Sequence, residues 1–135
     1  MTDAALIQKK LAFIETCVED IRRLSRPQEL RSDRREQRFV LYTLQIAIQA
    51  ALDVASHIVS DRRLGEPVRN RDLFTLLAED VPFPEGLPGR LADMAGFRNV
   101  VVHLYDEVDL GVVERILDHD IQDLIRFVEV VRRLL

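Results

Sequence analysis

Apolar residues recur every three or four positions along most of this chain, which is the spacing of one face of an α-helix. The first run predicts a helix that ends before Pro27, with an apolar face formed by Leu6, Ile7, Leu11, Ile14, Val18, Ile21 and Leu24. The second run begins after Asp33, which together with Glu36 resembles a capping box, and continues to about Leu64, where Gly65 ends it. Its apolar side chains cover roughly two-thirds of the helix circumference, more than a surface helix of a monomer needs. We therefore expect this helix to be buried on two sides, one against its own bundle and one against a second copy of the chain.

Further helical segments complete the expected fold. A short helix spans about 71–79, and a loop rich in proline and glycine follows over 80–89. Pro88 fits the first turn of the next helix, which ends near His103, and Asp109 can cap a last helix. The apolar seam of that last helix is Val113, Ile116, Leu117, Leu124, Val128, Val131 and Leu135. Because no alternating β pattern competes, residues 1–135 are predicted to form a single all-α domain, an up-and-down bundle of about four to five helices.

The composition is typical of a globular protein, with 47% hydrophobic and 31% charged residues. We see neither a signal peptide nor an apolar stretch near the ~20 residues that span a bilayer, so we expect a cytoplasmic protein without membrane association. Cys17, the single cysteine, lies among helix-periodic apolar residues and is expected in the core.

Charge is distributed unevenly along the sequence. The formal net charge of −4 argues against a general nucleic-acid coat protein. Residues 22–38 hold seven arginines and three acids, a local +4, whereas residues 106–123 hold seven acids and one arginine, a local −6. Each segment alone is best interpreted as a solvated surface, and together they also suit RNA on one side and a basic partner on the other.

The end of the helix before position 104 carries the most distinctive chemistry. Arg98, His103 and Tyr105 follow one another closely in an otherwise apolar segment. RNA can be cut without a metal ion when its own 2′-hydroxyl attacks the adjacent phosphate, provided that a proton is removed, the leaving oxygen is protonated and the phosphorane is stabilised. Histidine can move protons at neutral pH, and the arginine fork binds phosphate oxygens. Arg98 and His103 are therefore a minimal set for phosphodiester cleavage.

The spacing of this pair raises a geometric difficulty. Five residues along an α-helix correspond to a rotation of about 140°, so the two side chains would not share a face. Either the helix ends or tightens near His103, or a two-fold dimer brings two copies of the motif into one cleft, which we prefer.

Each residue also has a simpler interpretation. Arg98 can extend from a helix end into solvent or pair with Asp53, His103 can cap the helix, and Tyr105 can be a packing residue. Asp53 belongs to a polar strip of the second helix that is either its solvated face or a cleft lining: Tyr42, Gln45, Gln49, Asp53 and Ser56.

Other chemistry-bearing clusters are weaker. His57 and Asp61 lie one turn apart, and Asp118, His119 and Asp120 are contiguous, but neither group has further ligands at the spacing of a metal site. There is also no glycine-rich phosphate loop and no nucleophile elbow. We expect neither a metal ion nor a cofactor.

The run Phe97-Arg98-Asn99-x3-His103-x-Tyr105, followed by an acidic segment, resembles the Arg-x4-His-x-Tyr signature of HepT-like HEPN proteins. The order of the elements is also similar, so the resemblance extends over most of the chain. Members of that family are toxins of two-gene, type II-like toxin–antitoxin modules. The resemblance implies an all-α homodimer that cuts RNA without metal at a site between the protomers.

The resemblance also implies roles for individual residues. Arg98 would hold the phosphate and His103 would be the acid/base, with Asn99 and Asp53 in support and Asp53 orienting Arg98. Tyr105 would be the hydroxyl to which a cognate minimal nucleotidyltransferase, an MntA-like antitoxin, adds AMP to silence the toxin.

Two other functions stay open at the level of the sequence. One is a non-catalytic module that binds a nucleotide or a nucleotidyltransferase, which the acidic segment near the motif favours because negative charge weakens attraction to RNA. The other is a plain helical scaffold.

Overall fold

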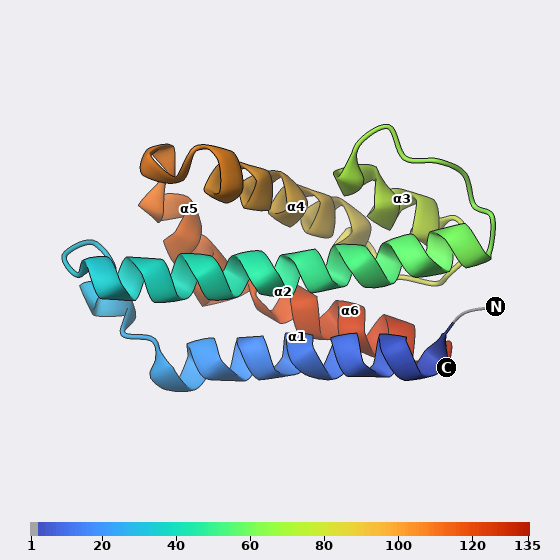
Figure 1. Cartoon of the computed structure of the whole chain (residues 1–135), viewed down its shortest axis with the longest axis horizontal. Coiled ribbons are helices and arrows are strands. Elements are labelled where there is room, and N and C mark those ends of the chain that lie inside the picture. Colours follow the sequence, from blue (N-terminus) through green and yellow to red (C-terminus); the bar gives the residue numbers. More distant parts are fainter. Residues whose placement is uncertain (1–2) are drawn as a thin grey trace.

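The structure is a computed structural model that describes residues 3–135 and, within them, contains helices and turns but no strands. Figure 1 shows an elongated bundle built of six α-helices: α1 (Ala4–Leu24), α2 (Arg34–Asp61), α3 (Leu73–Ala78), α4 (Leu87–His103), α5 (Leu110–Arg115) and α6 (Gln122–Arg132). The predicted all-α bundle is confirmed. One helix more than expected is found, because the last predicted helix is divided into α5 and α6.

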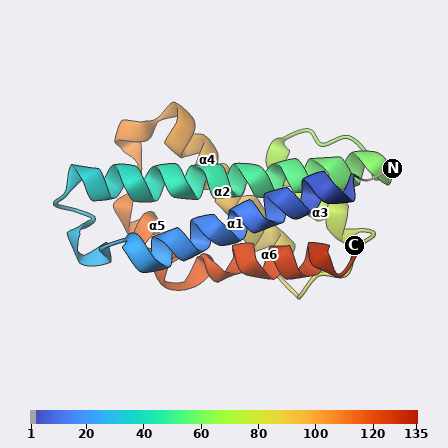
Figure 2. The same ribbon diagram turned by 60° about the horizontal axis from the view of Figure 1, so that its bottom comes forward.

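The longest helix, α2, is the centre of the bundle. It packs against α1, α3, α4 and α6, so neighbours from its own chain surround most of its circumference (Figures 1 and 2). Its buried positions include Val40, Leu44, Ala47, Ala51 and Val54, all with no exposed surface. The wide apolar circumference of this helix is therefore explained by burial within one chain. The apolar circumference of α2 therefore gives no reason to infer a second copy of the chain, and a dimer has to be argued from another surface.

By length and composition, α2 is also the one described helix that could cross a membrane. Within its most apolar stretch of 18 residues, 61% is buried inside the bundle. This is the behaviour of a core helix in a folded domain.

The start of α2 differs from the expected capping box. Asp33 caps the helix as predicted, with its Oδ1 accepting from the Arg35 N–H at 2.8 Å. The buried carboxylate of Glu36 instead accepts from the backbone N–H of Arg26 at 2.7 Å. Glu36 thus connects α2 to the turn that follows α1, because that N–H lies beyond the end of α1, has no helical partner and is satisfied by the carboxylate.

The final helical segment contains a π-helical turn, η4 (Ile116–Asp120). Here the N–H of Ile121 donates to the carbonyl of Ile116 at 2.8 Å, five residues back. Five residues make about one π turn, so Ile116 and Ile121 are both buried, whereas a regular α-helix would separate them by about 140°. The predicted seam therefore needs correction: it includes Ile121 and Phe127, and Leu135 is 42% exposed.

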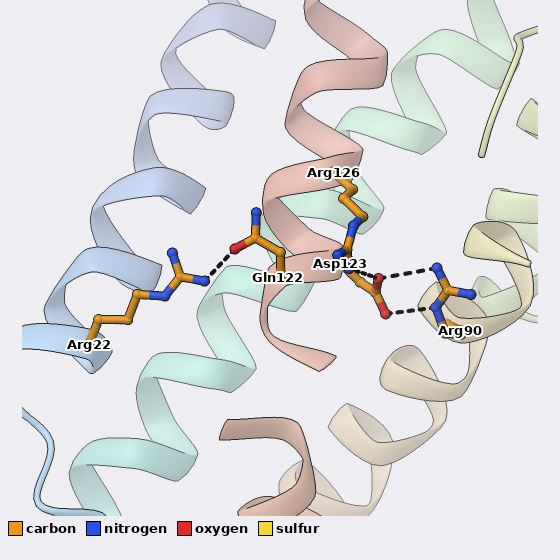
Figure 3. Close-up of polar contacts among 5 residues, drawn as sticks. All are labelled: Arg22, Arg90, Gln122, Asp123 and Arg126. Carbon is orange, nitrogen blue, oxygen red and sulfur yellow. Dashed lines mark hydrogen bonds and ion pairs between the residues drawn. The ribbon is translucent and has the colours of Figure 1, made fainter. Parts of the chain in front are cut away.

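Helix α4 is held in place by a buried carboxylate on α6. Asp123, whose side chain is 2% exposed, accepts from Arg90 Nε at 3.0 Å and Nη2 at 3.3 Å, and from Arg126 Nη1 at 2.8 Å. Figure 3 shows the two guanidinium groups converging on this carboxylate, while Gln122, the preceding residue, accepts from Arg22 of α1. Adjacent residues of α6 thus connect the motif helix and the first helix to the same point of the bundle.

Candidate functional site

The motif lies on the second half of α4 and on the turn that follows. The helix begins after Gly86, which has a left-handed φ of 79°, and Pro88 lies in its first turn as predicted. Met94, Ala95 and Val101 are buried and fix the helix against the core, while Val100 and Val102 are exposed. The half-buried Arg98 and Asn99 therefore lie between the core and an apolar outer face.

Arg98 has an incompletely satisfied guanidinium group. Its Nη1 donates to the Oδ1 of Asn99 at 3.0 Å, and its buried Nε has no hydrogen-bond partner. Among residues 3–135, no carboxylate forms an ion pair with it. Because guanidinium is always charged and a buried donor without a partner costs free energy, an anion is the natural complement of this group.

Asp53 does not meet Arg98 within the chain. Its carboxylate accepts from Gln49 at 2.8 Å and from Lys10 at 3.3 Å, between α1 and α2. The structure thus brings Asn99, but not Asp53, to the motif arginine of the same protomer. The sequence-based pairing of Asp53 with Arg98 is not found, because Lys10 on α1 supplies a cation next to the carboxylate.

His103 is the last residue of α4 and is exposed to solvent. The helix stays α-helical through this position and ends at Leu104, which has φ −134° and ψ 48°. Arg98 and His103 therefore keep their angular separation of about 140°. Of the two possibilities considered for the sequence, the helix does end at His103, but it stays α-helical up to that residue, so its end alone does not bring the two side chains onto one face.

Tyr105 opens a short 3-10 turn, η3 (Tyr105–Glu107), at the end of the bundle where α2 begins (Figure 1). The guanidinium carbon of Arg38 lies 5.5 Å from the centre of its ring. The hydroxyl of Tyr105 is buried and has no hydrogen-bond partner. Tyr105 borders two hollows, one of about 420 Å³ shared with Tyr42 and one of about 210 Å³ shared with Arg34 and Arg38.

Sequence reasoning missed the contribution of Arg38. Its position in the arginine-rich segment was visible, but nothing in the sequence indicated that α2 would begin beside the turn after α4. The other histidines are not drawn into this region, since His57 lies exposed on α2 and His119 lies exposed in the π turn. Within the part of the chain that the structure describes, no group of three or more His, Cys, Asp or Glu is placed to hold a metal ion.

The acidic segment is partly neutralised by internal contacts. Glu114 accepts two hydrogen bonds from Arg31, which lower the pKa of Glu114. Asp109 caps α5 as predicted, accepting from the Gly111 N–H at 2.8 Å, and Asp123 is buried beneath two arginines. Fewer of the negative charges near the motif are therefore free to repel RNA than the count of acidic residues in the sequence suggests.

Comparison with known proteins extends these observations. A family model described as "Ribonuclease HepT-like" matches residues 14–131. The chain is 33% identical to an mRNA nuclease HepT of Shewanella oneidensis over 128 residues, which cover 94% of this chain and 96% of that protein. It is also 35% identical over 66 residues to a tRNA nuclease HepT of Aphanizomenon flos-aquae, covering 49% of this chain and 45% of that protein.

The fold agrees equally well. A solved tri-AMPylated HEPN toxin of Shewanella oneidensis, in complex with an MNT antitoxin, superposes with a TM-score of 0.87 at 33% identity and covers 98% of this chain and 99% of that chain. The match in sequence and the match in structure both span almost the whole molecule. The chain therefore belongs to the HepT-like ribonuclease family.

Proposed function

We propose that this protein is a metal-independent endoribonuclease toxin that works as a homodimer in the cytoplasm. The observation that carries the proposal is Arg98, a half-buried guanidinium with an unpaired Nε and no carboxylate partner among the described residues. Such a group is prepared for an anion, and it lies on the same helix as an exposed histidine. The relatives named as mRNA and tRNA nucleases support RNA as the substrate.

The chemistry follows from these two groups. The 2′-hydroxyl of the substrate attacks the adjacent phosphorus as its proton is removed, and the bond from phosphorus to the 5′-oxygen breaks as that oxygen is protonated. The products are a 2′,3′-cyclic phosphate and a free 5′-hydroxyl. Arg98 stabilises the extra negative charge of the phosphorane, and His103 acts as the acid/base that takes the proton from the 2′-hydroxyl or gives one to the 5′-oxygen. Asn99 holds the guanidinium of Arg98 in position through its 3.0 Å hydrogen bond.

A second copy of the chain resolves the angular separation of Arg98 and His103. Val100, Val102 and Leu104 are exposed on and just beyond the end of α4, and Leu104 is 50% exposed. A two-fold contact through this apolar surface would cover it and bring one protomer's Arg98 toward the other's His103. The exposed apolar residues at the end of the motif helix thus favour a dimer.

Substitution of the two residues tests the catalytic proposal. Arg98→Ala and His103→Ala should each slow RNA cleavage by a factor of ~100 or more, whereas His119→Ala, at an exposed histidine in the π turn, should leave the rate unchanged. Cleavage should also persist in EDTA. Equal rates in the wild type and in the two motif variants would disprove the proposal, and binding of RNA without cleavage would favour the non-catalytic module.

Mixing the two inactive variants tests the shared site. In a mixed dimer of Arg98→Ala and His103→Ala protomers, one site receives both intact residues if the arginine and histidine come from different chains. Part of the activity should then return after mixing and subunit exchange. If exchange is verified by mass spectrometry and no activity returns, each site is built from one protomer.

We propose further that an MntA-like nucleotidyltransferase silences the protein by adding AMP to Tyr105. The AMPylated state of the solved Shewanella oneidensis toxin supports this regulation. The chain has two tyrosines, and both border the same hollow of about 420 Å³, with Tyr42 62% exposed. Co-expression with the transferase should give AMP-sized mass increments that Tyr105→Phe abolishes and Tyr42→Phe retains. Increments that depend on Tyr42 would refute the assignment.

A further inference from the structure

The arginine-rich segment divides into two groups in the folded chain. The arginines at the end of α1 and in the following turns have polar partners: Arg22 with Gln122, Arg23 with Glu19, Arg26 with Glu29 and Arg31 with Glu114. The three that begin α2 do not. Within residues 3–135, no carboxylate pairs with the side chains of Arg34, Arg35 or Arg38.

Two of these three arginines face the same hollow. Arg34 and Arg38 lie one helical turn apart and line the hollow of about 210 Å³, together with Gln37, Tyr105 and Asp106. Arg35 is exposed on the same turn but does not line the hollow. The hollow therefore has two uncompensated cations on one wall and an acid, Asp106, on another.

The hydroxyl of Tyr105 points to the kind of ligand. It is buried and has no hydrogen-bond partner among the described residues, and Tyr105 is one of the residues that line this hollow. Tyr105 shares the lining of this hollow with the two arginines, and an anionic oxygen bound there can accept from both guanidinium groups and from the tyrosine hydroxyl. Phosphate oxygens have this chemistry and match the arginine fork in geometry.

We propose that Arg34 and Arg38, with Tyr105, form a subsite for a ribonucleotide phosphodiester at the end of the active site. With free Tyr105, the ligand is the backbone of bound RNA beyond the scissile bond. After AMP addition, the phosphate attached to Tyr105 occupies the same arginines. The inference rests on the proposed function, and it gives silencing a direct cause, because the adduct and the substrate compete for one phosphate position.

Binding of an uncleavable RNA tests the subsite without relying on catalysis. A short single-stranded 2′-O-methyl RNA lacks the attacking hydroxyl, so its Kd can be measured with every variant. Arg34→Ala and Arg38→Ala should each weaken binding by about tenfold, the order expected for a charge-assisted phosphate contact. The slope of log K against log salt should also become shallower by about 0.7 for each phosphate that the variant no longer neutralises.

Arg35→Ala is the matched control, since it removes one arginine from the same helical turn and changes the net charge equally. It should alter the Kd by less than about twofold if direct binding of phosphate rather than general charge is responsible. Arg38→Lys should recover only part of the affinity, because a point charge lacks the fork. Asp106→Asn should strengthen binding, since it removes the acid from the hollow.

Phosphorus NMR of the AMPylated protein distinguishes the two sources of phosphate. Arg34→Ala and Arg38→Ala should shift the resonance of the phosphodiester on Tyr105, and Arg35→Ala should not. A response in RNA binding alone assigns the subsite to substrate, and a response in the resonance alone assigns it to the adduct. If Arg35→Ala weakens RNA binding as much as the other two variants and none of the three shifts the resonance, the proposal is overturned. The RNA measurement stands even if Tyr105 is never modified or the protein never cuts RNA.

Discussion

The buried carboxylate of Asp123 offers the sharpest test of how the motif helix is held. Three charge-assisted hydrogen bonds converge on it, two from Arg90 of α4 and one from Arg126 of α6 (Figure 3). Asp123→Asn keeps the shape of the side chain but removes the charge and directs an amide N–H₂ group at guanidinium donors. The loss of one partner of a buried ion pair generally costs about 3–5 kcal/mol.

The expected loss here is somewhat smaller. Arg90 and Arg126 are 45% and 44% exposed, so water can solvate both guanidinium groups once the carboxylate charge is gone. We therefore expect Asp123→Asn to lower the free energy of unfolding by about 2–3 kcal/mol, a substantial part of the ~5–15 kcal/mol typical of a domain. Asp93→Asn is the matched control, because Asp93 is 78% exposed, pairs with Arg71 at 3.1 Å and should cost less than about 1 kcal/mol.

Urea unfolding followed by circular dichroism measures both losses. The experiment should be run at two protein concentrations, since dissociation of a dimer makes the midpoint depend on concentration. If Asp123→Asn loses less than about 0.5 kcal/mol, or no more than Asp93→Asn, the carboxylate does not hold α4 and the reasoning is refuted.

Four further outcomes are expected. Burial, with a smaller contribution from the charge of Asp20, raises the pKa of the Cys17 thiol to about 11 from its usual 9.0. The folded protein should therefore resist alkylation at pH 9, whereas urea-unfolded protein should react at once. Rapid alkylation of the native protein would contradict this expectation. The same shift stabilises the protein below pH 9, and this contribution should disappear as the pH rises from 9 to about 11, because the unfolded chain then ionises first, an effect absent in Cys17→Ala. Glu36→Ala should lower the free energy of unfolding by about 1–3 kcal/mol by leaving a backbone N–H without its acceptor, and an unchanged urea midpoint would show that water replaces it. Arg132 donates to Glu15 and lowers the pKa of Glu15 in the folded protein. The stability that depends on this pair should therefore be lost as the pH falls from the usual value of 4.5 through the lower folded-state pKa, by no more than about 1 kcal/mol for this partly exposed pair, and Glu15→Gln should remove that dependence.

Local sequence signals predicted the elements whose ends depend on local chemistry. The cap by Asp33, the first turn at Pro88 and the end of the motif helix at His103 are all found where the sequence indicated. These features depend on a few neighbouring residues, and the physical cost of a missing cap or a misplaced proline is local.

Features that depend on distant contacts could not be predicted in the same way. Glu36 satisfies the N–H of Arg26 rather than that of Asp33, and Asp53 meets Lys10 rather than Arg98, because the packing of α1 on α2 decides both. The same packing explains the broad apolar surface of α2 without a second copy of the chain. The chemistry of the residues identified the candidate side chains, but the fold decides which hydrogen-bond and ion-pair partners each side chain has.

The sequence predicted five site residues, and the structure changes the set in two ways: Asp53 does not meet Arg98 within the chain, and Arg38 is added. Arg98 and Tyr105 were identified from the motif, and both prove to carry buried polar atoms without partners. Asn99 was predicted in a supporting role and does bond Arg98. Arg38 was not predicted, because only the approach of the first turns of α2 to the turn after α4 places it over the Tyr105 ring.

The π turn between α5 and α6 also determines where this helical segment can change its length. A π turn holds one residue more than the α turn it replaces, so it accommodates one extra residue within an otherwise continuous helix. Because the turn is wide, the apolar residues after η4 still face the core, and the extra residue is accommodated on the exposed side at Asp118 and His119. Relatives with an unbroken last helix should therefore be one residue shorter at this point. Deletion of either exposed residue here should yield a longer regular helix with the same buried face, which makes this turn a natural place for the family to gain or lose a residue.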